Sequence, residues 1–145
     1  MYMELKIEVD GNLSLLLINK TREIQKIWEF SNSWGWNSLH FEFRKVDSND
    51  VLILKRKKSM IWSPNIPTYF TIAPHKSLKI SFDIGDKTWE KNWDLTTIKN
   101  EVLLVKAFLI ILETQESKEF NVFTGRLESN TIKLKPPHKW CLSND

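Results

Sequence analysis

Strict alternation of apolar and polar side chains is the feature of this sequence that most restricts its fold. The stretches MELKIEV at 3–9, LHFEFR at 39–44 and SLKISFD at 77–83 each place apolar residues at every second position. Because successive side chains of an extended chain point to opposite faces, this period of two predicts β-strands with one buried side and one solvent-facing side. A helix facing a core would instead carry apolar residues three and four positions apart.

Further strands are predicted between turn signals. Asp10 and Gly11 separate the first alternating stretch from a second apolar one, which indicates a hairpin or a tight strand corner. Strands are also predicted at 51–55, along the long stretch 101–112 and through 132–134, and YFTIAP at 69–74 leads into the alternating stretch that follows it. The stretch 101–112 is apolar on both faces, which is typical of a central strand or of a strand with a partner on its outer face.

Two segments do not fit a single period. The segment 21–30 carries apolar residues at helical spacing, but it also fits a twisted strand. The segment 86–101 spaces Trp89 and Trp93 four positions apart, and we predict an irregular or one-turn helical crossover there. We expect Trp89 to fill the base of the core.

The number of strands relative to the chain length predicts the fold class. About seven to nine short strands separated by turns indicate an all-β protein, an immunoglobulin-like antiparallel β-sandwich. We place a single domain at 1–135 and assign 136–145 to a polar C-terminal tail. With 41% hydrophobic and 27% charged residues in 145, the chain has the composition of a globular protein that can bury one core.

Four stretches resemble the strands of known immunoglobulin-like domains. They are LLLINKTREIQKIWEF at 15–30, TIAPHKSLKISFDI at 71–84, LLVKAFLI at 103–110 and FTGRLESNTIKLK at 123–135. In the second of these, Pro74 and His75 stand where such domains usually have Pro-Gly. Residues 3–135 therefore resemble a fibronectin-III or immunoglobulin-like module of the bacterial kind, in particular the intracellular proteinase inhibitors of bacilli. This resemblance implies a β-sandwich that binds and inhibits a proteinase.

Cysteine and charge content narrow the compartment and the partners. Cys141 is the single cysteine, so no intramolecular disulfide can form. The N-terminal stretch lacks a basic leader, and the apolar region 102–112 is too short for a membrane helix, which needs about 20 residues. We therefore expect a cytoplasmic protein without membrane contact. The net charge of +3 is too small to indicate a polyanionic partner, and we do not expect nucleic acid binding, although KRKK at 55–58 and KLKPPHK at 133–139 are basic.

The sequence contains no motif for catalysis, a metal or a cofactor. His40, His75 and His138 are far apart, and no HxH, HxxxH or CxxC spacing occurs. Cys141 lies near His138, but in a tail that would not hold the geometry of a thiol-base pair. We therefore expect no catalytic residue, no metal ligand and no cofactor.

The most distinctive loop is SMIWSPNIPTYF at 59–70. Two prolines restrict its backbone, and a rigid loop that carries Trp62 and Ile66 loses less entropy on binding a partner. The predicted partner-binding residues are Trp62, Pro64, Asn65, Ile66, Pro67 and Tyr69, together with Trp34 and Trp36. The alternative, in which Trp62 and Ile66 fold back over the end of the core, stays open.

Trp34 and Trp36 flank Gly35 immediately before the alternating strand at 39–44. If that strand extends back through them, the two indoles form one outward aromatic patch. If Gly35 forms a bulge, they turn inward and cap the core. We favour the bulged, mostly buried corner.

The sequence thus predicts a non-enzymatic, cytoplasmic protein-binding module. Its sharpest forms are an inhibitor of a proteinase or another enzyme, and an immunity protein that neutralises a toxin. One alternative is a carbohydrate-binding module that uses exposed Trp34, Trp36 and Trp62. A second alternative is a structural subunit of a larger assembly, which an exposed apolar edge at 102–112 would support.

Overall fold

The computed structural model describes residues 3–10, 12–31, 34–48, 50–57, 67–84, 88–91 and 100–136. Within these ranges the strands are β1 (Met3–Asp10), β2 (Asn12–Asn19), β3 (Gln25–Trp28), β4 (Leu39–Lys45), β5 (Val51–Arg56), β6 (Tyr69–Ile72), β7 (Ser77–Phe82), β8 (Trp89–Lys91), β9 (Leu103–Ile111) and β10 (Gly125–Leu134). One short helix, α1 (Gln115–Glu119), follows β9. Each strand pair is antiparallel, so the predicted all-β class is confirmed.

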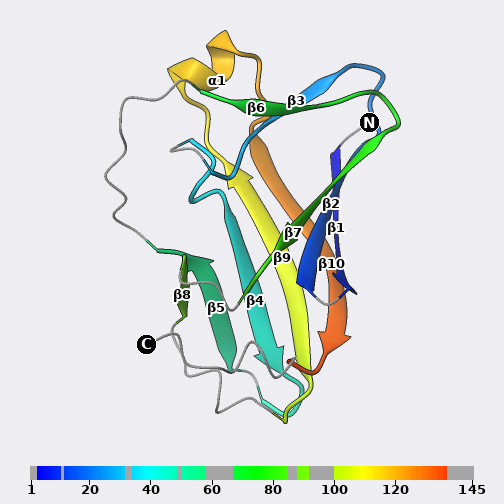
Figure 1. Ribbon diagram of the computed structural model, residues 1–145, viewed down its shortest axis with the longest axis vertical. Coiled ribbons are helices and arrows are strands. Elements are labelled where there is room, and N and C mark those ends of the chain that lie inside the picture. The colour runs from blue at the N-terminus through cyan, green and yellow to red at the C-terminus, as the bar shows by residue number, and fades with distance from the viewer. Residues whose placement is uncertain are drawn as a thin grey trace.

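The strands form three sheets with the orders β1–β2–β7, β10–β9–β4–β5–β8 and β3–β6. The three-stranded sheet lies across the five-stranded sheet, and β3, β6 and α1 gather at one end (Figure 1). Strand β9 pairs with β10 on one side and with β4 on the other. It is therefore a central strand, as its two apolar faces predict, and it offers no exposed edge to a larger assembly.

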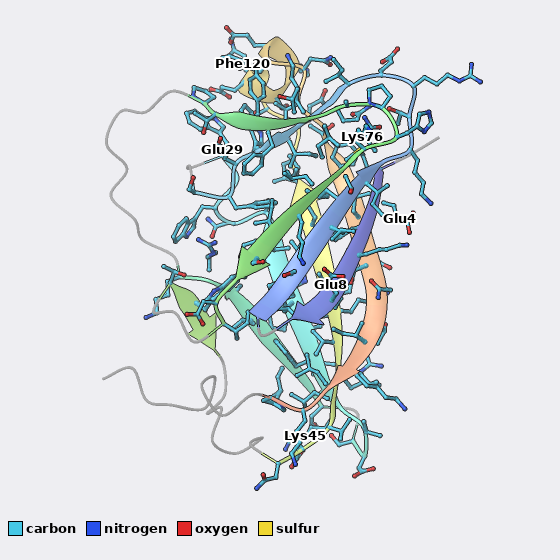
Figure 2. All side chains as sticks on the ribbon, turned by 45° about the vertical axis from the view of Figure 1, so that its right-hand side comes forward. Glu4, Glu8, Glu29, Lys45, Lys76 and Phe120 are labelled. Carbon is cyan, nitrogen blue, oxygen red and sulfur yellow. The ribbon has the colours of Figure 1, made fainter. Side chains whose placement is uncertain are left out.

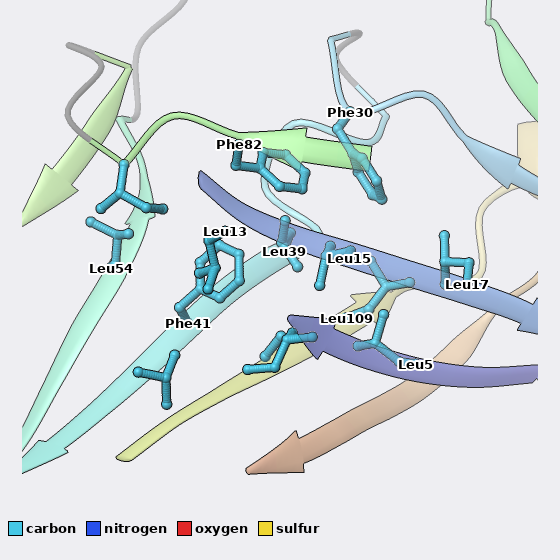
Figure 3. Packing of buried hydrophobic residues seen from close by; sticks show 14 of the residues in the cluster. Leu5, Leu13, Leu15, Leu17, Phe30, Leu39, Phe41, Leu54, Phe82 and Leu109 are labelled. Carbon is cyan, nitrogen blue, oxygen red and sulfur yellow. The ribbon is translucent and has the colours of Figure 1, made fainter. Parts of the chain in front are cut away.

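The apolar core lies between the three-stranded and the five-stranded sheet (Figure 3). Leu13, Leu15 and Leu17 of β2 are 0% exposed, as are Phe41 of β4 and Leu109 of β9. The alternation seen in the sequence places these side chains on the facing sides of the two sheets. Burial of each such side chain contributes about 1.5–3 kcal/mol, so this layer is the main source of stability.

Two predicted features of the first thirty residues can now be assigned. Strands β1 and β2 pair antiparallel with Asp10 opposite Asn12, so of the two predicted alternatives, a hairpin and a tight strand corner, the hairpin is observed. The ambiguous segment 21–30 contains β3 rather than a helix, and Ile27 pairs with Phe70 of β6. As an extended strand, β3 pairs its backbone hydrogen-bonding groups with those of β6. A helix at this position would leave the backbone groups of β6 without these partners.

Strand β8 corrects the prediction for part of the segment 86–101. Trp89 pairs with Arg56 of β5, so an irregular or helical crossover at 89–91 is wrong. The Trp89 indole is 3% exposed and lies 5.7 Å from the Phe41 ring and 5.8 Å from the Phe82 ring, which places it in the core as expected. Because β8 is extended, the Trp89 side chain points into the core while the backbone of β8 pairs with β5. Trp93 lies outside the described residues.

Helix α1 is an element that periodicity does not predict, because its five residues are too few to show a helical repeat. Its signal is local. The Thr114 hydroxyl accepts a hydrogen bond from the Ser117 amide at 3.0 Å, and the Ser117 hydroxyl accepts one from the Thr114 amide at 2.8 Å. This reciprocal pair is a capping box, which satisfies two amides that a helix start leaves unpaired.

The corner at Gly35 is a turn, and neither the regular nor the bulged strand is observed there. Residues 34–37 form turns, and β4 begins only at Leu39. A Cβ atom on Gly35 would lie 2.2 Å from the Glu29 carbonyl oxygen and 3.2 Å from the Trp28 Cβ. Close approach of this turn to the end of β3 therefore requires glycine. Strand parity does not relate the side chains of residues 34 and 36, since they lie in a turn.

Candidate binding surface

Only part of the predicted binding loop falls within the described residues. Four of its predicted contact residues lie outside them: Trp62, Pro64, Asn65 and Ile66. Pro67 is half-buried just before β6, and Tyr69 is the half-buried first residue of that strand. The role assigned to this loop therefore stays a prediction.

Tyr69 and Trp34 belong to one aromatic cluster, which we call the aromatic corner: Trp28, Trp34, Tyr69 and Phe120. The Trp28 ring lies 5.8 Å from that of Trp34 and 6.2 Å from that of Phe120, and the Tyr69 and Phe120 rings are also 6.2 Å apart. The Lys26 ammonium lies 4.9 Å above the Tyr69 ring and donates a hydrogen bond to the Phe120 carbonyl oxygen at 3.1 Å. Figure 2 shows Phe120 at this end of the molecule, opposite Lys45. These contacts attach α1 and the small sheet to the core.

Trp36 lies apart from the aromatic corner. It is 8% exposed, and its indole N–H donates to the Lys57 carbonyl oxygen at 2.9 Å. The Arg56 guanidinium lies 4.4 Å from the Trp36 ring centre, 4.8 Å from that of Trp89 and 5.8 Å from that of Phe82. Trp36 is thus mostly buried, as the corner interpretation expects. It is too buried to act as an exposed sugar-stacking ring.

The outer side of the five-stranded sheet carries polar and aliphatic side chains that point away from the core. Strand β4 sets the pattern, because Leu39, Phe41 and Phe43 face inward and the residues between them face outward. Pairing with β5, β8, β9 and β10 extends this row across the sheet. We call it the charged sheet face: His40, Glu42, Arg44, Val51, Ile53, Lys55, Glu90, Leu104, Lys106, Phe108, Arg126 and Glu128.

Two open hollows indent the charged sheet face. The first has a volume of about 500 Å³ and is lined by Asn37, Leu39, His40, Ile53, Lys55, Arg56 and Glu90. The second has a volume of about 380 Å³ and is lined by Glu42, Arg44, Val51, Leu104, Lys106, Phe108 and Thr131. Each hollow combines aliphatic side chains with charges of both signs. Such a surface suits a partner that offers both apolar and charged groups.

A stacked pair of rings lies at the centre of this face. The His40 and Phe108 rings are 6° from parallel with centres 5.0 Å apart. The Arg126 guanidinium lies 5.1 Å and the Lys106 ammonium 5.4 Å from the Phe108 ring, which is only 5% exposed under these groups. Burial lowers the pKa of His40 from its ordinary value of 6.5, and Arg126 lowers it further, whereas the Glu42 carboxylate 4.0 Å away raises it. His40 is therefore neutral near pH 7.

Three charged side chains on this face pair with one another: Glu128, Lys106 and Arg126. Glu128 accepts hydrogen bonds from Lys106 at 3.1 Å and from Arg126 at 2.9 Å. The bond from Lys106, followed by that from Arg126, lowers the pKa of the Glu128 carboxyl from its ordinary value of 4.5. Because these side chains are exposed, each ion pair adds little to stability. Their effect is to fix the charge pattern that a partner would meet.

Arg44 and Lys55 differ from these paired charges. Both side chains are exposed, and neither forms an ion pair or a hydrogen bond with another side chain in the described part of the chain. Val51 lies opposite Arg44 in the β4–β5 register, and Lys55 lies opposite His40. Val51 and Ile53 are 36% and 37% exposed, so two aliphatic side chains lie between two unpaired cations.

None of the residues of the charged sheet face is among the predicted binding residues. A signal for part of it was present, because the alternation at 39–44 places His40, Glu42 and Arg44 on the outward side of their strand. Alternation within one strand does not reveal which strands lie beside it. The order β10–β9–β4–β5 brings the remaining side chains to this face, and that order depends on long-range pairing.

No group of three or more His, Cys, Asp or Glu side chains is placed to hold a metal ion in the described ranges. Of the residues that the structure describes, no helix has the length and apolar character to cross a membrane. Comparisons of the chain with models of protein families, with curated proteins and with solved structures find no match.

Proposed function

We propose that this chain is a non-enzymatic protein-binding module with an immunoglobulin-like sandwich, and that it binds another protein through the charged sheet face. The observation that carries the proposal is the row formed by Arg44, Val51, Ile53 and Lys55. Its aliphatic side chains are 36% and 37% exposed, and its cations have no side-chain partner among the described residues. Exposed aliphatic side chains grouped with charges on one face are typical of a protein-binding surface.

The strand order supports the immunoglobulin-like part of this proposal. In such domains one sheet contains the first, second, fourth and fifth strands, and the other contains the third, sixth and seventh, with two further strands added to the second sheet in variable-type domains. The orders β1–β2–β7 and β10–β9–β4–β5 are consistent with this arrangement when β3, β6 and β8 are set apart, but no described strand of the first sheet takes the place of the fourth strand. The proposed binding face is then the outer face of the sheet that contains β10, β9, β4 and β5.

The proposed partner is an enzyme or a toxin in the cytoplasm, and the module acts as an inhibitor or an immunity protein. This form of the proposal comes from the resemblance of 3–135 to the intracellular proteinase inhibitors of bacilli. The loop around Trp62 is a second proposed contact. Its described end at Tyr69 lies in the aromatic corner, away from the charged sheet face.

The test is affinity capture from the native cytosol with matched variants of the full chain. Ile53→Lys places a charge in the middle of the charged sheet face, and we expect it to reduce capture of a stoichiometric partner by about tenfold or more. Ile24→Lys is the control, because Ile24 is 59% exposed and lies outside that face. We expect wild-type capture from this control.

Retention of the partner by Ile53→Lys and its loss in Trp62→Ala would assign binding to the loop instead of the sheet face. Failure of the wild-type chain to capture any stoichiometric protein would contradict the proposed function. Thermal unfolding of each variant separates loss of binding from loss of the fold. Since the Ile53 side chain points away from the core, the melting temperature of Ile53→Lys should remain close to that of the wild type.

A further inference from the structure

The charge pattern of the sheet face restricts the chemistry of its partner. Lys106 and Arg126 share the single carboxylate of Glu128, and His40 lies beside Glu42. Arg44 and Lys55 form no ion pair with a described side chain, although Glu90 lies opposite Lys55 in the β5–β8 register. A partner that covers them must replace the water it removes, because a buried charge without a counter-charge is costly. Carboxylates are the groups that do this.

The spacing of the two cations sets the spacing of the carboxylates. Lys55 lies opposite His40, and Arg44 lies four residues further along β4, opposite Val51. Four residues of extended chain span about 13 Å, so the cations are roughly that far apart along the strand direction. The side chains of Val51 and Ile53 lie between them, one in each hollow. An extended segment along β5 would therefore meet cation, aliphatic surface and cation in turn.

We propose that the charged sheet face binds an extended acidic segment of a partner protein, with two carboxylates about four residues apart and an apolar side chain between them. This inference rests on the proposed function and specifies the partner's chemistry. Single-stranded nucleic acid fits less well. The Phe108 ring is 5% exposed and offers no surface on which a base could stack.

The experiment follows the amide resonances of the ¹⁵N-labelled full chain during titration. The probe is the synthetic peptide acetyl-Gly-Glu-Ser-Leu-Ser-Glu-Gly-amide, and the matched peptide carries glutamine in place of both glutamates. We expect the acidic peptide to shift resonances of β4 and β5 with a Kd about tenfold or more below that of the glutamine peptide. Raising the salt concentration should weaken the acidic peptide more than the glutamine peptide.

Variants assign the effect to the two cations. The double variant Arg44→Gln and Lys55→Gln should remove the preference for the acidic peptide. Lys76→Gln should retain it, because that exposed lysine follows the β6 turn, away from the charged sheet face (Figure 2). Equal affinity for both peptides, shifts confined to other strands, no shift at all, or tighter binding of a single-stranded oligonucleotide would each overturn the inference.

The outcome is distinguishable from failure of the proposed function. If Ile53→Lys abolishes capture of the native partner but the double variant of Arg44 and Lys55 captures it fully, the sheet face is the binding site and its partner is not acidic. If Ile53→Lys captures the partner as the wild type does, the face is not the binding site. The proposed function then fails with its refinement.

Discussion

His75 adopts a backbone conformation that its side chain disfavours. Its φ is 62°, in the left-handed region, and its amide donates to the Asn19 carbonyl oxygen at 2.8 Å. The sequence resemblance places Pro-Gly where Pro74 and His75 stand, and the left-handed φ explains why glycine is the usual residue there. A residue with a Cβ atom in the left-handed region destabilises the fold by about 1–2 kcal/mol. Glycine removes this strain, but it also makes the unfolded chain more flexible, which offsets part of the gain.

We therefore predict that His75→Gly raises the free energy of unfolding by up to about 1 kcal/mol, measured by urea unfolding at pH 7. Ala73→Gly is the matched control on the same exposed turn, at a residue without positive φ. It should lower the free energy of unfolding by about 0.5–1 kcal/mol, because it only adds freedom to the unfolded chain. Equal losses in both variants would show that the His75 side chain makes a contact that outweighs the backbone strain.

Among the elements, strand β10 contains a bulge that a side-chain hydrogen bond stabilises. Its register with β9 shifts between Glu128 and Thr131, so Ser129 and Asn130 lie opposite the single residue Ala107. Ser129, one of these two, is 6% exposed and takes over the lost pairing. Its hydroxyl accepts a hydrogen bond from the Ala107 amide at 2.8 Å and donates to the Asn130 carbonyl oxygen at 2.7 Å. A side chain thus replaces the backbone acceptor that the bulge removes.

Ser129→Ala should lower the free energy of unfolding by about 1–3 kcal/mol, because it leaves the buried Ala107 amide without an acceptor. Hydrogen exchange at the Ala107 amide should become faster by the factor that corresponds to this loss of free energy. Ser14→Ala is the control. Ser14 is also buried, but its hydroxyl partner, that of Ser81, is exposed and can bind water instead, so the loss should stay below about 1 kcal/mol. Equal losses in the two variants would mean that the Ser129 hydroxyl does not support the bulge.

Sequence patterns predict the elements of this protein where the pattern is long enough to define a period. The alternation in 39–44 fixes β4 and its buried face, and the hairpin at Gly11 follows from its turn residues. Strand β8 and helix α1 have three and five residues, too few for a period, and their form depends on the pairing of Trp89 with β5 and on the Thr114 cap. Short elements are therefore defined by contacts outside them.

The candidate surface was less predictable than the core for a related reason. Burial repeats along a single strand, so the sequence of β4 identifies Phe41 as a core residue. The row of Arg44, Val51 and Lys55 exists only because β4 pairs with β5 in one register. A shift of that register by one residue would place Val51 and Lys55 on the inner side. Periodicity within a strand carries no information about that register.

At the scale of the whole molecule, asparagine side chains join sheets whose backbones do not pair. The Asn130 side-chain oxygen on β10 accepts from the Ile7 amide of β1 at 2.8 Å, and its amide group donates to the Ile7 carbonyl oxygen at 3.4 Å. Asn19 at the end of β2 is 0% exposed and donates to the carbonyl oxygens of Ile72 and Glu23, both at 2.8 Å. These contacts couple the three sheets, so we expect them to unfold together and a single melting temperature to describe the molecule.

Among the described residues, three groups should make that melting temperature depend on pH. The pKa values of His40, Glu4 and Glu128 are all lower in the folded protein than their ordinary values of 6.5, 4.5 and 4.5. Burial lowers the pKa of His40, and a hydrogen bond from Lys20 lowers that of Glu4. In each case the unfolded chain takes up its proton at a higher pH than the folded protein, so acid favours unfolding. The stability that each group contributes is complete above its ordinary pKa and is lost as the pH falls through its lowered folded pKa.

We predict that the melting temperature, measured by calorimetry, falls in two stages on acidification. The first begins below pH 6.5 as His40 is protonated beside Arg126, and the second begins below pH 4.5 as the two carboxylates are protonated. His40→Gln cannot take up a proton, so it should remove the first stage and keep the second. His75→Asn, which changes an exposed histidine outside the charged sheet face, should keep both. A first stage that persists in His40→Gln would place the acid sensitivity elsewhere and would remove the pH dependence that we assign to the charged sheet face.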